Sequence, residues 1–178
     1  MRSNNGFTLI ELVIVIIVLG VLAAIAIPKF INIQHDASSA VVKNLSGSLK
    51  TAIDLVNVRK EIDGSETSVD YNGNTITITI VNGYPQPSAP QMRFLLEMDL
   101  PSTTWTSNWL TVPCDGSAFC LVGNRPPLSG VPPIDGFDRG TAVFFWPNGY
   151  VLESCFAYYV NLDEENVSPL IGFEDKGC

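Results

Sequence analysis

The stretch that decides the fold is residues 7–27, FTLIELVIVIIVLGVLAAIAI, which contains a single charged residue, Glu11. Val, Ile and Leu occupy most positions around a helix built from it, so no side of that helix would prefer water. Such a helix is about 30 Å long at roughly 1.5 Å per residue, which matches the hydrocarbon core of a bilayer. The stretch therefore predicts a helix that lipid or other protein must bury.

Glu11 is the anomaly in this stretch. A carboxylate costs about 2.5–3.5 kcal/mol at the centre of a bilayer and less near an interface, so it usually has a function or a partner. The polar leader MRSNNG (residues 1–6) precedes the apolar run and carries one basic residue, Arg2.

The heptapeptide GFTLIEL (residues 6–12), followed by an unbroken apolar run, resembles the N-terminus of type IV pilins and their relatives. The resemblance implies that a prepilin peptidase cleaves the bond between Gly6 and Phe7, and that the new N-terminus of Phe7 is methylated. It is strong over this N-terminal stretch, whereas the rest of the chain is similar to the family only in layout.

A role for Glu11 follows from charge as well as from the family. Cleavage would free an α-amino group on Phe7, which is largely cationic at neutral pH. If helices of several copies stack side by side with an axial stagger, the amine of one copy meets the carboxylate of another. The pairing offsets part of the cost of burying each charge. The resemblance assigns Glu11 this role, and a solvated glutamate at the helix end is the alternative.

Two other interpretations of the apolar stretch compete. A secretory signal peptide would end in a small-x-small cleavage site, and Ala24-Ile25-Ala26 provides one. Against it, Glu11 interrupts the apolar centre and the helical pattern continues beyond that site. A single-pass anchor is the second interpretation, and Arg2 favours an orientation with the N-terminus inside.

Gly20 and Pro28 interrupt the apolar pattern. Proline removes a backbone hydrogen bond and kinks or breaks a helix, so we expect a bend near residues 24–28. Glycine lets a neighbouring helix approach closely. The resemblance implies that the helix loosens between these two residues in filaments, although packing in a membrane explains both equally well.

After Pro28 the pattern becomes amphipathic, which predicts that the helix continues and packs one face on a globular domain. Asp63-Gly64-Ser65 is expected to stop it. The predicted apolar stripe is Ile33, Ala37, Ala40, Val41, Leu45, Leu49, Ala52, Ile53 and Val56.

The rest of the chain reads as strands. Residues 66–71 and 74–81 predict a hairpin around a tight Asn72-Gly73 turn, and residues 141–146 and 150–160 predict a second hairpin. Residues 91–98 suggest a short helix ended by Pro101, and Trp105 and Trp109 are expected in the core. The tail after Asn161 is acidic and reads as a loop.

The layout is α+β, a long N-terminal helix whose C-terminal half packs on an antiparallel sheet. This is the pilin fold that the resemblance implies. The expected divisions are a leader at 1–6, an apolar membrane and filament-core helix at 7–28, its amphipathic half at 29–62, and a globular domain with two disulfides at 63–178.

Cys114, Cys120, Cys155 and Cys178 give an even count behind a membrane-crossing segment, which indicates an oxidising compartment and two disulfides. Three pairings are open. We favour Cys114–Cys120, across a short loop, and Cys155–Cys178, which would attach the C-terminal tail to a strand. The second is similar to the family's habit of closing its C-terminal region with a disulfide. Zinc is a poor alternative, because there is no CxxC spacing and the one histidine, His35, is distant in the sequence.

The net charge of −8, from 18 acids and 10 bases, argues against a nucleic-acid partner. The sequence lacks the GxSxG, GxxxxGK[ST] and HExxH motifs, and we expect no enzyme activity, no cofactor and no metal site. Two acidic segments, residues 135–138 and 163–165, contain oxygen ligands that Ca²⁺ would accept, although solvated loops explain them better.

The sequence therefore indicates a structural subunit of a type IV pilus, a homopolymer assembled through its N-terminal helix. The short leader and Phe7 resemble the type IVa branch, and the globular layout resembles mannose-sensitive haemagglutinin pilins, which implies surface attachment and biofilm formation. Expected partners are copies of itself, the prepilin peptidase, the pilus assembly machinery, the inner membrane before assembly and an unknown surface receptor. The alternatives are a minor pilin or a pseudopilin of type II secretion, which two disulfides disfavour, and a membrane-anchored periplasmic sensor or enzyme domain.

Overall fold

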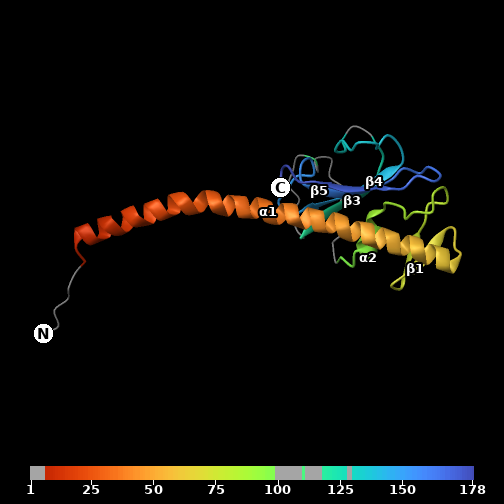
Figure 1. The fold of residues 1–178 in the computed structure, drawn as a ribbon, viewed down its shortest axis with the longest axis horizontal. Coiled ribbons are helices and arrows are strands. Elements are labelled where there is room, and N and C mark those ends of the chain that lie inside the picture. Colours follow the sequence, from red (N-terminus) through yellow and green to blue (C-terminus); the bar gives the residue numbers. More distant parts are fainter. Residues whose placement is uncertain (1–6, 99–109, 111–117, 128–129) are drawn as a thin grey trace. The chain divides into compact units, whose positions relative to one another are not determined.

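The computed structural model describes residues 7–98, 110, 118–127 and 130–178 (Figure 1). The chain divides into two compact units, Met1–Ala37 and Ser38–Cys178, and each is described by itself. The described elements are α1 (Leu9–Asp63), β1 (Ser68–Tyr71), β2 (Asn74–Thr77), α2 (Ala89–Leu95), β3 (Phe119–Arg125), β4 (Thr141–Pro147), β5 (Phe156–Asn161) and β6 (Leu170–Glu174). The fold is α+β, a long N-terminal helix followed by antiparallel strands, as the sequence predicts.

The helix α1 is uninterrupted from Leu9 to Asp63. It passes through Gly20 and Pro28, so the proline does not break it. It ends where the sequence predicts, because Gly64 adopts a left-handed φ of 63° and its N–H donates to the Lys60 carbonyl at 3.0 Å. This is the glycine-based stop that many helices use.

The second half of α1 packs one face on the domain, but the predicted stripe is partly wrong. Val41 is 40% exposed and Ala40 is exposed, while Val42, which was not predicted, is completely buried. Ile33 and Ala37, in the first unit, are also exposed. The buried positions recur every three or four residues, as one face of a helix requires: Ser39, Val42, Leu45, Ser46, Leu49, Ala52, Ile53 and Val56.

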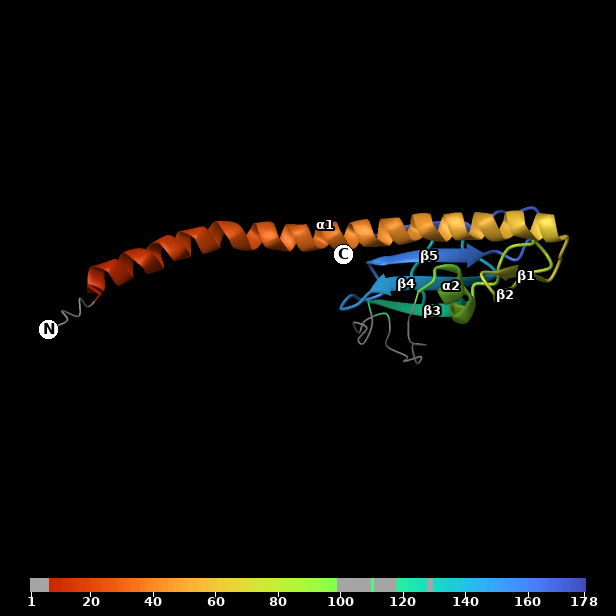
Figure 2. The ribbon, with the colours of Figure 1, turned by 90° about the horizontal axis from the view of Figure 1, so that it is seen from below.

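The four-stranded sheet has the antiparallel order β3-β4-β5-β6. Figure 2 shows its strands β3, β4 and β5 beside the second half of α1. Successive residues of a strand point to opposite faces, and both faces of β4 are buried. Val143 and Phe145 belong to the core that contains α1 residues, whereas Phe144 and Trp146 belong to a second core on the other face.

Loop residues contribute to that second core. Its partly buried members include Ile134, Phe137 and Val167, which lie outside the strands. The sheet is therefore covered by α1 on one face and by connecting segments on the other.

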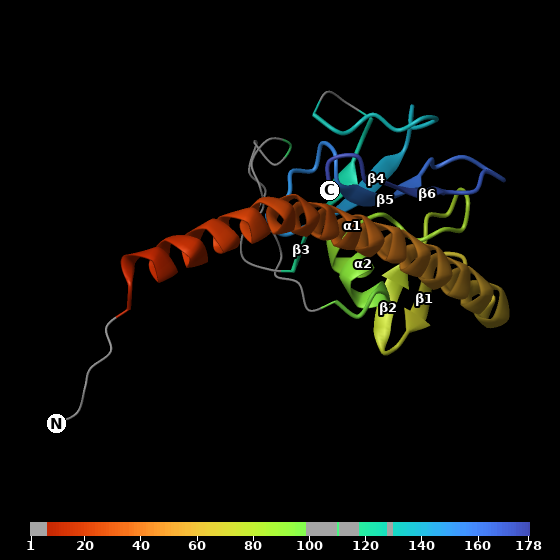
Figure 3. The ribbon, with the colours of Figure 1, turned by 60° about the vertical axis from the view of Figure 1, so that its left-hand side comes forward.

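The first predicted hairpin is present as β1 and β2 (Figure 3). Asn72 and Gly73 have φ values of 52° and 77°, and positive values at both central residues are those of a tight primed turn. The second strand is shorter than predicted and ends at Thr77. Beyond it the chain turns, with Ile78 forming an isolated bridge to Pro85.

Three other predicted elements need correction. The short helix is Ala89–Leu95 rather than 91–98, and Glu97, with φ of 51°, follows its end. The strand expected from 150 starts at Phe156, because the chain turns after β4, with the Tyr150 N–H bonded to the Pro147 carbonyl. The tail is not all loop, since β6 pairs with β5 over five residues.

Candidate functional site

The first candidate site is the apolar start of α1. Every side chain from residue 9 to residue 25 is exposed, and the large apolar ones range from 37% exposed at Val13 to 80% at Leu9. Among the described residues, Leu9–Ile27 is long and apolar enough to cross a membrane, and none of it is buried. Exposed apolar surface of this extent marks a region that lipid or protein covers.

Thr8 and Glu11 form a reciprocal cap at the start of this helix. Glu11 Oε2 accepts from the Thr8 N–H at 2.9 Å and from Thr8 Oγ1 at 2.7 Å. The Glu11 N–H in turn donates to Thr8 Oγ1 at 3.4 Å. This is a capping box, in which two otherwise unpaired N–H groups are satisfied together. We did not predict the partner, although the Thr-x-x-Glu spacing in residues 8–11 would have indicated it.

The other predicted processing and assembly residues lie along the same segment. Phe7 is 83% exposed, whereas Gly6 lies outside the described residues. A Cβ built on Gly20 has no atom within 4 Å, so this glycine serves no packing need inside the described chain. Pro28 lies within α1.

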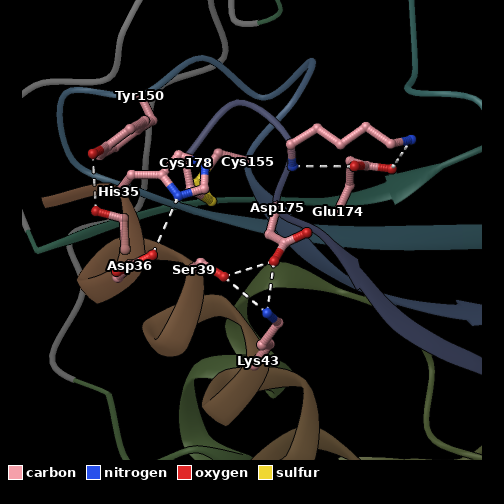
Figure 4. Close-up of a disulfide and its surroundings, with 11 residues drawn as sticks. His35, Asp36, Ser39, Lys43, Tyr150, Cys155, Glu174, Asp175 and Cys178 are labelled. Carbon is pink, nitrogen blue, oxygen red and sulfur yellow. Dashed lines mark hydrogen bonds and ion pairs between the residues drawn. A yellow bond between two sulfur atoms is a disulfide. The ribbon is translucent and has the colours of Figure 1, made fainter. Parts of the chain in front are cut away.

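The second candidate site is the C-terminal disulfide (Figure 4). Cys155 and Cys178 are bonded, with Cα atoms 4.8 Å apart across 23 residues of sequence. The bond attaches the C-terminal residue to the segment before β5, and both cysteines pack with Val42 of α1. The other predicted pair cannot be described, because Cys114 lies outside the described residues, while Cys120 is buried in β3. The Cys114–Cys120 bond stays a prediction.

A polar cluster joins the disulfide-closed segment to α1. Asp175 Oδ2 accepts from Ser39 Oγ at 2.6 Å and from Lys43 Nζ at 2.8 Å. These contacts lower the pKa of the Asp175 carboxyl, with the Lys43 hydrogen bond as the larger cause and the Ser39 hydrogen bond next. Ser38 Oγ donates to the Tyr150 hydroxyl at 2.9 Å. Ser39 and Asp175 are 136 residues apart in the sequence, and Ser38 and Tyr150 are 112 apart, so no local pattern indicated either contact.

The acidic segments considered for Ca²⁺ have a different partner. The Arg139 guanidinium lies 3.3 Å from an Asp138 carboxylate oxygen and 3.0 Å from a Glu164 carboxylate oxygen. It therefore forms an ion pair with one carboxylate of each acidic segment. Its charge also lowers the pKa of Asp138, mainly through their hydrogen bond. Within the described part of the chain, no group of three or more His, Cys, Asp or Glu side chains is arranged to hold a metal ion.

Comparison with known proteins finds similarity to the N-terminal part of this chain. Residues 1–27 match the model of the prokaryotic N-terminal methylation motif. The type IV narrow pilus major component PilA5 of Thermus thermophilus is 41% identical over 59 residues, 33% of this chain and 50% of that protein. A fimbrial protein of Pseudomonas aeruginosa is 42% identical over 88 residues, 47% of this chain and 56% of that protein.

A protein of a type II secretion system is also similar to this chain. The type II secretion system core protein G of Pseudomonas aeruginosa is 29% identical over 86 residues, 48% of this chain and 58% of that protein. The chain thus spans about half the length of these relatives. No solved structure matches.

The methylation motif, the α+β fold and these relatives agree with one another. The N-terminal part of this chain is therefore similar to that of type IV pilins and of a type II secretion core protein, and its layout is a long N-terminal helix followed by antiparallel strands.

Proposed function

We propose that this chain is the repeating subunit of a type IV pilus, an extracellular filament held together by its N-terminal helix. The observation that carries the proposal is the apolar surface of residues 9–25, every residue of which is exposed. In water that surface is unfavourable at roughly 25 cal/mol per Å². Side-by-side packing with copies of the same helix removes it from water.

Before assembly, the same segment sits in the inner membrane as a single span, with residues 1–6 and Arg2 on the inner side. A prepilin peptidase removes the leader after Gly6, and Phe7 is methylated. In the division we propose, residues 7–28 form the filament core, 29–62 carry the domain, and 63–178 form the outer surface.

Glu11 then has two tasks. Within one chain it closes the capping box with Thr8. Between chains its carboxylate meets the freed amine on Phe7 of a neighbouring copy, which fixes the axial register as a single buried polar group does in a coiled coil. Gly20 lets the neighbouring helix come close, since no atom of the described residues lies within 4 Å of its Cβ position.

The test is N-terminal analysis of filaments sheared from cells. The polypeptide should begin at Phe7 and carry one methyl group on its amine. An extracellular protein that begins at Ile27, or one that stays monomeric in detergent-free buffer with residues 7–27 intact, would contradict the proposal.

A separate part of the proposal concerns the role of the filament in attachment. Resemblance to the mannose-sensitive haemagglutinin group supports attachment to surfaces and biofilm formation through an unidentified receptor. A strain that lacks the chain should lose attachment in a static biofilm assay and regain it on complementation. Unchanged attachment of the deletion strain would remove this part and leave the filament proposal standing.

The similarity to a type II secretion core protein favours a second candidate, a pseudopilin. Abundance separates the two. A sheared extracellular fraction dominated by this polypeptide supports a major pilin, whereas retention in the cell envelope together with loss of protein secretion in a deletion strain supports a pseudopilin.

A further inference from the structure

The chain contains three Asn-Gly pairs, at residues 72–73, 82–83 and 148–149. An asparagine followed by glycine can lose ammonia without an enzyme, because the backbone nitrogen of the glycine attacks the side-chain amide carbon. Glycine favours this step, since it has no Cβ to crowd the attacking nitrogen. Hydrogen bonds of the amide or of the attacking N–H oppose it, because they must break before the ring closes. The three pairs therefore differ in reactivity according to the hydrogen bonds that each one makes.

The pair Asn82-Gly83 is held by hydrogen bonds at both reacting groups. The Asn82 amide nitrogen donates to Asn161 Oδ1, and Asn82 Oδ1 accepts from the Tyr84 N–H at 3.2 Å. The Gly83 N–H, which contains the attacking nitrogen, donates to the Thr79 carbonyl at 2.8 Å. Asn161 is only 2% exposed, so the network is anchored inside the domain. Ring closure at Asn82 would therefore require the whole turn to open.

The pair Asn72-Gly73 is held at one reacting group. The Asn72 amide nitrogen donates to Glu97 Oε1 at 2.7 Å, and both of these side chains are exposed. Water readily replaces a hydrogen bond at such a position, so the bond contributes little net free energy. The Gly73 N–H has no acceptor among the residues that the structure describes. We expect Asn72 to be slowed only in part.

The pair Asn148-Gly149 is exposed in the turn after β4, and neither reacting group is held. Gly149 has a φ of 82°, and the Tyr150 N–H donates to the Pro147 carbonyl at 3.2 Å, as in a type II turn. The Asn148 backbone N–H donates to the Ala118 carbonyl at 3.0 Å. Within the described part of the chain, the Asn148 side chain and the Gly149 N–H make no hydrogen bond. The amide can therefore rotate toward the attacking nitrogen.

We propose that Asn148-Gly149 is a site of spontaneous deamidation, which the fold permits there and slows at Asn82-Gly83. The Gly149 nitrogen loses its proton to solvent and bonds to the side-chain amide carbon of Asn148. The amide nitrogen takes up a proton from water and leaves as ammonia, and a cyclic succinimide results. Water then adds to either carbonyl carbon of the ring and opens it to aspartate or isoaspartate. The balance is one water consumed and one ammonia released, without a cofactor.

The products alter the turn in charge and in length. Each event replaces a neutral amide with a carboxylate, which adds one negative charge to a chain whose net charge is −8. Isoaspartate also routes the backbone through the side-chain carbons, so the turn becomes one atom longer. The turn leads directly to Tyr150, whose hydroxyl accepts from Ser38 Oγ of α1 at 2.9 Å. Isoaspartate formation should therefore disturb this contact between the turn and α1.

Peptide mapping by mass spectrometry tests the proposal on the full chain, purified in detergent and aged at mildly alkaline pH. Asn148 should deamidate at least about tenfold faster than Asn82, equivalent to about 1.4 kcal/mol in activation free energy, with Asn72 between them. The rate should rise with pH, because the attacking nitrogen must lose its proton. Deamidation of Asn82 at the same rate as Asn148, or none at Asn148, would overturn the proposal.

The same chain in denaturant, with its disulfides reduced, is the matched control. Unfolding removes the hydrogen bonds that distinguish the three pairs, so their rates should converge. An unchanged ratio of rates in the unfolded chain would show that local sequence rather than the fold sets the order, and would overturn the proposal.

A substitution provides a second readout. Asn148→Gln keeps the amide but lengthens the side chain, so the same attack would need a larger and less favourable ring. An isoaspartyl methyltransferase should label the aged unaltered chain, and the folded Asn148→Gln variant should lose most of this labelling. Equal labelling of the two chains would place the modification elsewhere and overturn the proposal. These measurements use the purified chain, so their outcome is independent of whether the chain forms the proposed filament.

Discussion

The Nζ atom of Lys43 lies 2.8 Å from the Oδ2 atom of Asp175, and the buried Ser39 donates to the same oxygen. Lys43 also lies 5.5 Å from the centre of the Phe173 ring. These contacts hold the C-terminal segment on α1. The Cys155–Cys178 bond joins the same segment to the residue before β5, and both cysteines pack with Val42 of α1.

The Asp175 contacts predict a pH-dependent stability. The pKa of the Asp175 carboxyl is lowered in the folded chain, first by the Lys43 hydrogen bond and then by that of Ser39. A lowered pKa stabilises the folded state above the ordinary aspartate value of about 3.9, and this stabilisation is lost as the pH falls through the folded value. Asp175→Asn should therefore lower the urea midpoint of the detergent-solubilised chain at neutral pH. The difference from the unaltered chain should shrink toward zero in strong acid, and a constant difference across pH would contradict the charge-based explanation.

Removal of the C-terminal disulfide should destabilise the domain. The bond closes a segment across 23 residues, and a cross-link of that size contributes about 2–4 kcal/mol, mainly by restricting the unfolded chain. The Cys155→Ser, Cys178→Ser double variant should lose about this much unfolding free energy in a urea titration. Reduced unaltered chain serves as the comparison, and a double variant as stable as the oxidised chain would show that the bond contributes nothing.

Two glycines should respond to alanine in opposite directions. A Cβ on Gly123 would overlap the Ala89 backbone nitrogen and lie 2.8 Å from the Pro87 carbonyl oxygen. Backbone atoms do not move aside cheaply, so Gly123→Ala should destabilise the domain by about 1–3 kcal/mol. Gly47, in α1, has nothing within 4 Å of its Cβ position, and Gly47→Ala should stabilise the helix by about 0.5–1 kcal/mol. Thermal unfolding of both variants measures the signs, and a Gly123→Ala variant that is as stable as the unaltered chain would show that the close contact at Gly123 has no energetic effect.

Separate substitutions should distinguish the two tasks of Glu11. Glu11→Gln keeps an oxygen that can accept from Thr8, so it preserves the cap while removing the charge. We expect it to abolish filament assembly with an unchanged amount of chain in the membrane fraction. Thr8→Ala removes the cap, which costs about 0.5–2 kcal/mol of helix stability, but keeps the carboxylate. It should reduce filament yield only in part, as measured by immunoblots of sheared and membrane fractions, and normal assembly of the Gln variant would exclude charge pairing.

Much of the fold could be predicted because its signals are local. The helix and its stop at Asp63-Gly64 follow from hydrophobic periodicity and from a glycine that accepts a left-handed φ. The tight turn at Asn72-Gly73 follows from the same conformational freedom. The apolar segment of the candidate site is equally local, since composition alone shows that no face of it suits water.

Other features were decided by contacts between distant residues. The strands β3 and β6 were not predicted, and β6 exists because it pairs with β5. Val42 rather than Val41 is buried because the domain, not the helix, determines which side of α1 it covers. The ion pair of Lys43 with Asp175 likewise joins segments far apart in the chain. The sequence by itself determined the helix and its uncovered apolar length, because both are local properties of backbone and side chains. Tertiary structure alone decided that β3 and β6 join the sheet and which side of α1 is buried, because these depend on strand edges and burial completed by residues that no local window contains.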